Sequence, residues 1–197
     1  MATLAALLIA LAALGGCGSV PETHYYTIGR IVPDAPAATG QVKMTVGIPR
    51  FEADGIYERD NLLFRKGDYE IAVDFYRRWG VPPQIMLAEA TIDYLRAAGL
   101  FSSVLRLPSM ADYDAVLSGR IIRFEEAGGQ MQLTLEFSLQ RYHGKTILWR
   151  QEVSSTSAVA VIASPEARIA ATEKCVADCL ARMADSLSSA NIDIHQP

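Results

Sequence analysis

The chain has 197 residues and a net charge of −4 at pH 7, and 50% of its residues are hydrophobic while 20% are charged. This balance is typical of a globular chain that buries a core, and not of a disordered one. Binding to nucleic acid needs a basic face, but 22 Asp and Glu residues outnumber 18 Lys and Arg residues. We therefore expect no nucleic-acid partner.

The N-terminal segment has the pattern of a cleaved export signal. Residues 1–16 contain no charged side chain, and their apolar run from Ala2 to Leu14 ends in two glycines. A membrane-spanning helix needs about 20 apolar residues, so this run is too short to cross a bilayer. Signal peptides have an apolar stretch of about 7 to 15 residues followed by small residues. We expect residues 1–16 to be removed as a signal peptide.

The cysteine that follows this segment indicates a lipid anchor. Leu14-Gly15-Gly16-Cys17 resembles the lipobox of bacterial lipoproteins, in which the Cys becomes an acylated N-terminus after cleavage. On this interpretation Cys17 carries a covalent lipid, we expect no other cofactor, and residues 17–40 form a lipidated N-terminal arm. The alternative is an ordinary secretory signal in which the position of Cys17 is a coincidence.

Alternating residues predict the first strands of the domain that follows the arm. Residues 31–40 are rich in Pro and Ala, which is typical of a linker. Apolar and polar residues alternate over residues 42–48, as in a half-buried strand. Residues 62–65 and 69–75 flank a Gly-containing turn and predict a β-hairpin, in which Phe75 continues the inward-facing alternation.

Spacings of three and four residues predict two amphipathic helices. The first has an apolar stripe from Ile85 to Leu95, and Gly99 ends it. The second begins with Ser164 as N-cap and Pro165 at the first helical position. Its apolar stripe consists of Ile169, Val176, Leu180, Met183 and Leu187.

Four further segments between the helices have strand patterns. Residues 103–107 predict a short strand, and residues 115–125 predict a longer one that is apolar on both faces and therefore central in its sheet. Residues 131–139 alternate strictly, and a turn at His143-Gly144 leads to a partner strand over residues 146–153. These segments predict an antiparallel meander.

The order of these elements sets the expected fold and domain organisation. We predict an α+β fold in which an antiparallel β-sheet has two amphipathic helices packed on one face. The predicted domain is a single unit over residues 41–190, and residues 191–197 form a C-terminal tail.

The motifs of catalytic chemistry are incomplete. Gly144-Lys145-Thr146 has the form of the end of a P-loop, but position 139 is Leu where that loop has Gly, and a strand follows instead of a helix. The three histidines, His24, His143 and His195, have no neighbouring ligand at metal spacing, and no Gly-x-Ser-x-Gly elbow occurs. We therefore expect a protein that is not an enzyme and that holds no metal.

Two further clusters are interpreted as structural features without a chemical role. Cys175 and Cys179 lie one turn apart on the second helix, a geometry that rarely allows a disulfide. The helical wheel places Cys179 at the flank of the apolar stripe and Cys175 among charged residues, so we expect Cys175 to be partly exposed. The pair Glu125-Glu126 precedes Gly128-Gly129 and predicts a solvated turn.

Short motifs follow one another along the chain after Cys17. They are Tyr25-Tyr26, Gly47-Ile48-Pro49, Leu62-Leu63-Phe64-Arg65 with Tyr69, Arg78-Trp79 with Pro82-Pro83, Phe101-Ser102-Ser103-Val104, Asp112-Tyr113 and Gly119. In this order and spacing they resemble the ABC-type transport auxiliary lipoprotein family, whose PqiC-like members accompany MCE-domain lipid-transport systems. One departure is Gly80, where the family often has Ala.

The resemblance implies an adaptor. Such lipoproteins are thought to meet an MCE-domain periplasmic protein, while a separate permease and ATPase supply energy. The resemblance also implies a Gram-negative bacterium, a link between the inner and outer membranes, and phospholipid or a second copy of the chain as further partners. Residue 18 is Gly, whereas an Asp after the Cys commonly retains a lipoprotein at the inner membrane, so we expect the periplasmic face of the outer membrane. The alternative function is that of a structural or assembly-chaperone lipoprotein unrelated to transport.

Aromatic and basic residues gather before the first helix and suggest a partner interface. The candidate residues are Tyr25, Tyr26, Tyr76, Arg78 and Trp79. Tyr, Trp and Arg are enriched in the cores of protein interfaces. The alternative is that most of these rings belong to the hydrophobic core.

Overall fold

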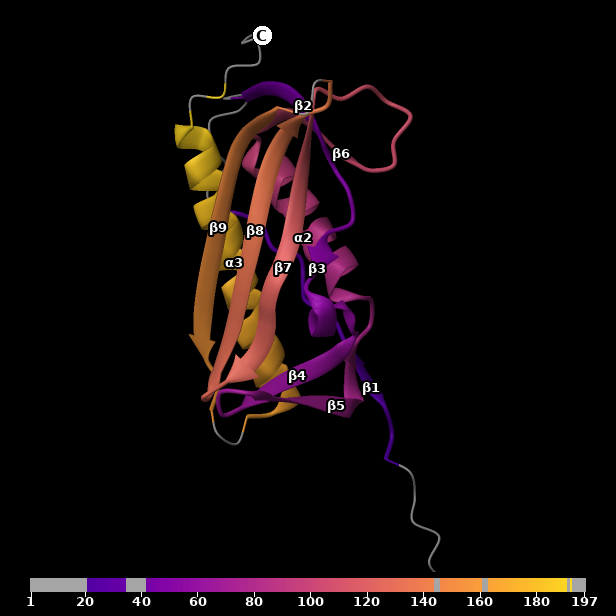
Figure 1. The fold of residues 1–197 in the computed structure, drawn as a ribbon, viewed down its shortest axis with the longest axis vertical. Helices are drawn as coiled ribbons and strands as arrows, with labels where there is room; N and C mark the ends of the chain where they lie inside the picture. The colour runs from indigo at the N-terminus through magenta and orange to yellow at the C-terminus, as the bar shows by residue number, and fades with distance from the viewer. Residues whose placement is uncertain (1–20, 35–41, 144–145, 161–162, 191, 193–197) are drawn as a thin grey trace, which may run out of the picture.

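The computed structural model describes residues 21–34, 42–143, 146–160, 163–190 and 192. The predicted signal peptide and Cys17 lie outside the described residues, and so does all of the predicted tail except Ile192. Figure 1 shows an elongated molecule in which a curved sheet is backed by two long helices.

The chain forms nine strands, two α-helices and one short 3-10 helix over the described residues. The elements in order are β1 (His24–Tyr26), β2 (Val42–Ile48), β3 (Glu52–Ala53), η1 (Gly55–Glu58), β4 (Asn61–Lys66), β5 (Glu70–Trp79), α2 (Pro83–Ala98), β6 (Phe101–Arg106), β7 (Ala115–Ala127), β8 (Gln130–Arg141), β9 (Ile147–Ala158) and α3 (Pro165–Ser189).

The strands form one sheet, and the α+β class is confirmed. The hairpin of β4 and β5 and the meander of β7, β8 and β9 are antiparallel, as predicted. The expectation of a wholly antiparallel sheet is wrong, because β2 pairs in parallel with both β6 and β7, and β4 also pairs in parallel with β7. Helix α2 carries the chain back along the sheet, and such a crossover allows β6 to run parallel to β2.

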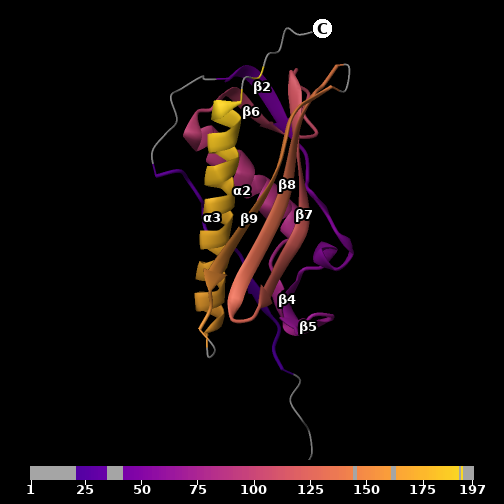
Figure 2. The same ribbon diagram turned by 60° about the vertical axis from the view of Figure 1, so that its left-hand side comes forward.

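Both helices cover the same face of the sheet, as Figures 1 and 2 show together. The strict alternation of β8 is confirmed, because its apolar residues are buried while the residues between them are partly exposed. The buried set is Met131, Leu133, Leu135, Phe137 and Leu139. Burial of each such side chain contributes about 1.5 to 3 kcal/mol, so this strand and the helix facing it anchor the core.

The predicted helix boundaries are also confirmed. The Ser164 hydroxyl accepts a hydrogen bond from the Ala167 amide at 3.3 Å, and Pro165 is the first helical residue of α3. Gly99 ends α2 with a left-handed φ of 65°, a conformation in which glycine has no Cβ penalty.

Gly119 in the central strand β7 provides space for an aromatic ring. It pairs with Phe137 of β8, and a Cβ built on Gly119 would lie 2.5 Å from atoms of the Phe51 ring. The Phe51 ring packs edge-on against Phe137 with 5.9 Å between ring centroids. Phe51 therefore occupies the volume that any larger residue at position 119 would need.

Residues 24–31 of the predicted arm pack against the folded domain. Strand β1 pairs in parallel with β5, and the Gly80 amide donates to the Tyr26 carbonyl at 2.6 Å. Farther along, the Gly29 amide donates to a carboxylate oxygen of Glu173 on α3 at 2.6 Å, and Ile31 is buried in the core. Of the predicted linker over residues 31–40, Ile31 is therefore part of the core, while residues 35–40 lie outside the described residues.

Two further expectations about burial are wrong. Cys175 is buried as completely as Cys179, because α3 packs this face against β8 and β9, where the Cys175 thiol lies 3.5 Å from the Met131 carbonyl. Glu125 is not in a solvated turn, because β7 continues to Ala127 and other elements cover its carboxylate.

Candidate functional site

The described chain begins at one end of the elongated molecule. In both ribbon views β1 rises from below the β4–β5 hairpin, whereas the loop between β6 and β7 and the start of β2 lie at the opposite end. Strands β8 and β9 have 12 residues each, and at about 3.3 Å per residue they extend about 40 Å. The residues that follow the proposed lipid anchor therefore enter at a defined end of a long domain.

Strand β5 carries a bulge at this end. Asn61 of β4 pairs with Arg78, but Leu63 pairs with Val73, so that residues 74–77 of β5 lie opposite Leu62 alone. Extra residues in one strand bend it and re-aim its side chains, and such bulges are common near functional sites.

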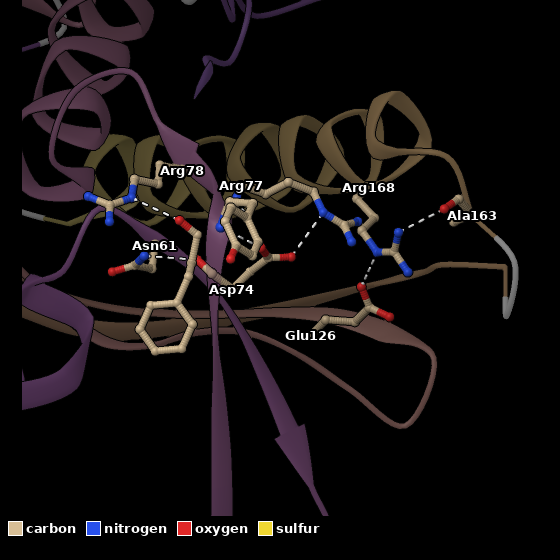
Figure 3. Close-up of polar contacts among 9 residues, drawn as sticks. Asn61, Asp74, Arg77, Arg78, Glu126, Ala163 and Arg168 are labelled. Atoms are coloured by element: carbon tan, nitrogen blue, oxygen red, sulfur yellow. Dashed lines mark hydrogen bonds and ion pairs between the residues drawn. The ribbon is translucent and has the colours of Figure 1, made fainter. Parts of the chain in front are cut away.

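Hydrogen bonds within the hairpin hold the bulge in place. One carboxylate oxygen of Asp74 accepts from the amides of Tyr76 and Arg77, each at 3.0 Å, as an Asp at a turn does. Its other oxygen forms an ion pair with Arg77 at 2.9 Å, and the Asn61 side-chain amide donates to the Asp74 carbonyl at 2.8 Å. Figure 3 shows Asn61, Asp74, Arg77 and Arg78 at this position. The bulge is therefore an ordered feature of the hairpin.

The bulge turns two aromatic side chains out of the core. Phe75 is 66% exposed and Tyr76 is 42% exposed, and beside them on β1 Tyr25 is 65% exposed. The expectation that Phe75 points inward is wrong, because the extra residues of the bulge break the alternation that holds from Ile71 to Val73.

The structure divides the predicted partner interface into two parts. Trp79 is only 4% exposed and stacks on Phe124 with ring centroids 5.2 Å apart, so its assignment to a surface interface is wrong and it belongs to the core. Tyr26 is half-buried and packs against the core. Tyr25, Tyr76 and Arg78 lie together at the surface, since Tyr25 pairs with Arg78 in the β1–β5 ladder.

We use the name bulge surface for Tyr25, Phe75, Tyr76, Arg77 and Arg78. Its two arginines each have an acidic partner: Arg77 pairs with Asp74 at 2.9 Å and Arg78 pairs with Asp60 at 3.7 Å. The cations of this surface are thus balanced locally, and its exposed area is dominated by aromatic rings.

A buried polar cluster fixes the hairpin to the central strand. The Glu125 carboxylate is fully buried and accepts from the Arg65 guanidinium at 2.5 and 3.1 Å and from the Tyr57 hydroxyl at 2.8 Å. Burial and the neighbouring Glu125 carboxylate raise the pKa of Tyr57, so its hydroxyl stays protonated and keeps donating. The cluster joins η1, β4 and β7 and so fixes the hairpin to the central strand.

Arg168 makes a second connection at this end. Its guanidinium donates to the Glu126 carboxylate and to the Ala163 carbonyl, both at 2.7 Å, as Figure 3 shows. The same guanidinium lies 5.6 Å from the centre of the Phe64 ring, a cation–π geometry. Helix α3 is therefore tied to β7 and β4 where the hairpin projects.

The described residues contain neither a metal-binding cluster nor a helix that could span a membrane. Within the ranges that the structure describes, no group of three or more His, Cys, Asp and Glu side chains could hold a metal ion. In the same part of the chain, no helix is both long and apolar enough to cross a bilayer.

The sequence contained a signal for the bulge that alternation alone misses. After Asp74 come four large residues, Phe-Tyr-Arg-Arg, with no apolar–polar alternation, directly before Trp79. Within a strand, a run of residues that lacks apolar–polar alternation is consistent with a bulge. An Asp directly before the run adds to this signal, because its side chain can accept hydrogen bonds from the backbone amides that follow.

Solved structures with this architecture exist. Protein XCC0632 from Xanthomonas campestris is 18% identical, with a TM-score of 0.68 over 82% of this chain and 92% of that one. An uncharacterized protein is 10% identical, with a TM-score of 0.65 over 85% of this chain and 99% of that one. At these identities the likeness concerns the fold alone. No curated protein matches the chain in sequence.

A family comparison covers most of the chain. The family described as the ABC-type transport auxiliary lipoprotein component matches residues 26–184, from the last residue of β1 to within α3. This range includes the β5 bulge, the buried cluster around Glu125 and the whole meander. The chain therefore belongs to the family of ABC-type transport auxiliary lipoproteins.

Proposed function

We propose that this protein is a non-catalytic, lipid-anchored adaptor of an ABC-type lipid-transport system at the periplasmic face of the outer membrane. Its partner would be an MCE-domain periplasmic protein, and a separate permease and ATPase would supply the energy. The membership in a family of transport auxiliary lipoproteins supports the transport role. Gly18, which stands directly after Cys17 where an Asp would retain the protein at the inner membrane, supports the location.

The observation that carries the proposal is the position at which the chain enters the domain. Strand β1 lies at the hairpin end, so a lipid on Cys17 would hold the domain by that end. The far end would then stand about 40 Å away along β8 and β9. An adaptor requires this separation of a membrane-held end from a free end.

The far end offers exposed side chains for a protein partner. Met110, in the loop between β6 and β7, is fully exposed. Tyr113 of the same loop packs on Tyr142 with ring centroids 4.3 Å apart. Large side chains on a projecting loop are typical of protein contact sites.

Lipidation is tested first. The full chain and a Cys17→Ser variant are expressed with a radiolabelled fatty acid in a Gram-negative host. We expect acyl label in the wild type and none in the variant. Label in both proteins, or in neither, would remove the anchor from the proposal.

Partner capture tests the transport role. The tagged full chain, carrying a photoreactive residue in place of Met110, is crosslinked in whole envelopes and purified. We expect an adduct with an MCE-domain protein, and a matched probe in place of the exposed Tyr69 at the opposite end should give less of it. Adducts with outer-membrane assembly proteins and none with an MCE-domain protein would favour the structural or assembly role instead.

A further inference from the structure

We propose that the bulge surface rests on the lipid headgroup layer of the membrane that carries the anchor. This inference depends on the proposed acylation of Cys17. It assigns to Tyr25, Phe75 and Tyr76 a lipid contact that fixes the orientation of the domain.

The reach of the chain restricts where this end can be. Six residues, Gly18 to Thr23, separate Cys17 from His24, and the seven steps from Cys17 to His24 span at most about 25 Å when extended. From His24 the chain is held against β5. A lipid on Cys17 therefore keeps the hairpin end within about 25 Å of the headgroups, whereas the opposite end lies about 40 Å farther along the domain.

The exposed side chains at this end match an interfacial environment. Tyr25 and Tyr76 have an apolar ring and a polar hydroxyl, and such side chains favour the boundary between water and hydrocarbon. Phe75 adds a wholly apolar ring, and Tyr69 at the turn of the same hairpin is 97% exposed. The rings of Tyr25, Phe75 and Tyr76 lie on two paired strands, and burial of their exposed area gains free energy by removing it from water.

The charges of the bulge surface indicate whether electrostatic attraction or the burial of aromatic rings dominates its contact with the membrane. Arg77 and Arg78 are each paired with an aspartate of the same hairpin region. A free Lys or Arg near an anionic membrane contributes about 1 kcal/mol, but a locally neutralised one contributes little. The contact is therefore driven by the aromatic rings, and its strength should change little with salt concentration.

The bulge is built to keep these rings outward. Asp74 binds the backbone amides of the two residues that follow the exposed Phe75, and the Glu125 cluster fixes the hairpin to β7. A multiply acylated Cys17 would anchor the chain stably by itself, so the second contact at the anchored end serves to set the tilt of the long axis.

The orientation is tested with the acylated full chain in vesicles of phosphatidylethanolamine and phosphatidylglycerol. An environment-sensitive fluorophore is attached to Cys introduced by Tyr76→Cys or, as the matched control at the far end, by Met110→Cys. The two native helix thiols are buried and should not react. We expect doxyl-labelled lipids to quench the probe at position 76 and not the probe at position 110, and a water-soluble quencher to show the reverse.

The outcomes separate this inference from the anchor itself. If the chain does not float with the vesicles, the anchor fails and the inference falls with it. If it floats but lipid quenchers reach neither probe or both equally, the anchor stands and the inference is wrong. Protection of position 76 that appears only after a protein partner is added also overturns it, in favour of a protein interface.

A second measurement examines the rings without the acyl chain. A Cys17→Ser chain without residues 1–16 should partition weakly onto the same vesicles, and adding Phe75→Ser should weaken this partition about tenfold, since the largely exposed ring can bury most of its area. Met110→Ser is the matched control and should leave partition unchanged. Both positions are exposed, so an unchanged melting curve shows that folding is intact; equal partition of the two variants would contradict the inference.

Discussion

Gly119 provides the sharpest test of the packing described above. Replacing a strand glycine by alanine in open space stabilises a protein by about 0.5 to 1 kcal/mol, because the unfolded chain loses freedom. Here the new Cβ would lie 2.5 to 2.6 Å from three atoms of the Phe51 ring, a distance that real Cβ atoms do not reach. Phe51 is buried and packs edge-on against Phe137, so the ring cannot move without losing that contact. We therefore expect Gly119→Ala to destabilise the protein instead of stabilising it.

The expected cost follows from the overpacking. Forcing an extra methyl group into a packed core costs about 1 to 3 kcal/mol. For a chain of this size each kcal/mol lowers Tm by about 2 to 4 °C. We therefore expect Gly119→Ala to lower Tm by several degrees, in thermal unfolding followed by circular dichroism and in urea titration.

The matched control is Gly80→Ala. A Cβ at Gly80 would meet only the Tyr26 carbonyl oxygen at 3.5 Å, which is ordinary van der Waals contact, so this variant should keep or slightly raise Tm. Phe51→Leu in the Gly119→Ala background should cost less than Phe51→Leu alone, since the smaller side chain frees the required space. A Gly119→Ala protein as stable as the wild type, or strictly additive effects in the double variant, would refute the packing described here.

The other predictions concern buried polar groups and the bulge. In the native Cys17→Ser chain, Cys175 and Cys179 should both resist a bulky maleimide and label together on unfolding; faster native labelling of either thiol would show that α3 is less closely packed. Burial raises the pKa of Cys179 from its ordinary value of 9.0 to about 12. As pH rises above about 9 the thiol therefore ionises in the unfolded chain before it does in the folded one, and the free energy of unfolding should fall. A free energy of unfolding that rises over this pH range in urea titrations would contradict the burial of Cys179. Glu125→Gln should cost about 2 to 4 kcal/mol in chemical denaturation, because it removes charge-assisted bonds from a buried site; a neutral effect would mean that the cluster does not hold the hairpin. Asp74→Ala should cost about 1 to 3 kcal/mol and speed amide hydrogen exchange at the two residues whose amides it binds, and unchanged exchange there would argue against an ordered bulge.

Much of the fold could be predicted because local patterns report local geometry. The strict alternation of residues 131–139, the Ser164-Pro165 start of α3 and the Gly99 end of α2 each depend on a few neighbouring residues. In contrast, no local pattern specifies that β2 pairs with β7, since that contact joins segments far apart in the sequence.

The candidate site was predicted in part. Tyr25 does lie beside Arg78 at the surface, because β1 pairs in parallel with β5, and Tyr76 is exposed two residues before Arg78. Trp79 was a candidate for the surface and Phe75 for the core, and the structure shows the reverse. The bulge in β5 interrupts the alternation between them, so that the inward and outward directions of the strand are exchanged. A shift of one residue moves a side chain to the other face of a sheet, so such errors follow directly from an undetected bulge.

The sequence by itself determined the α+β class, the helix ends, the long meander and the family resemblance, all of which depend on periodicity or on short motifs. Only the tertiary structure decided which polar groups are buried and which aromatic rings are free. Glu125 is buried because Arg65, 60 residues away in the chain, and Tyr57, 68 residues away, fold over its carboxylate. Burial is a property of the segments that cover a residue, and the residue's own neighbours in the sequence do not record it.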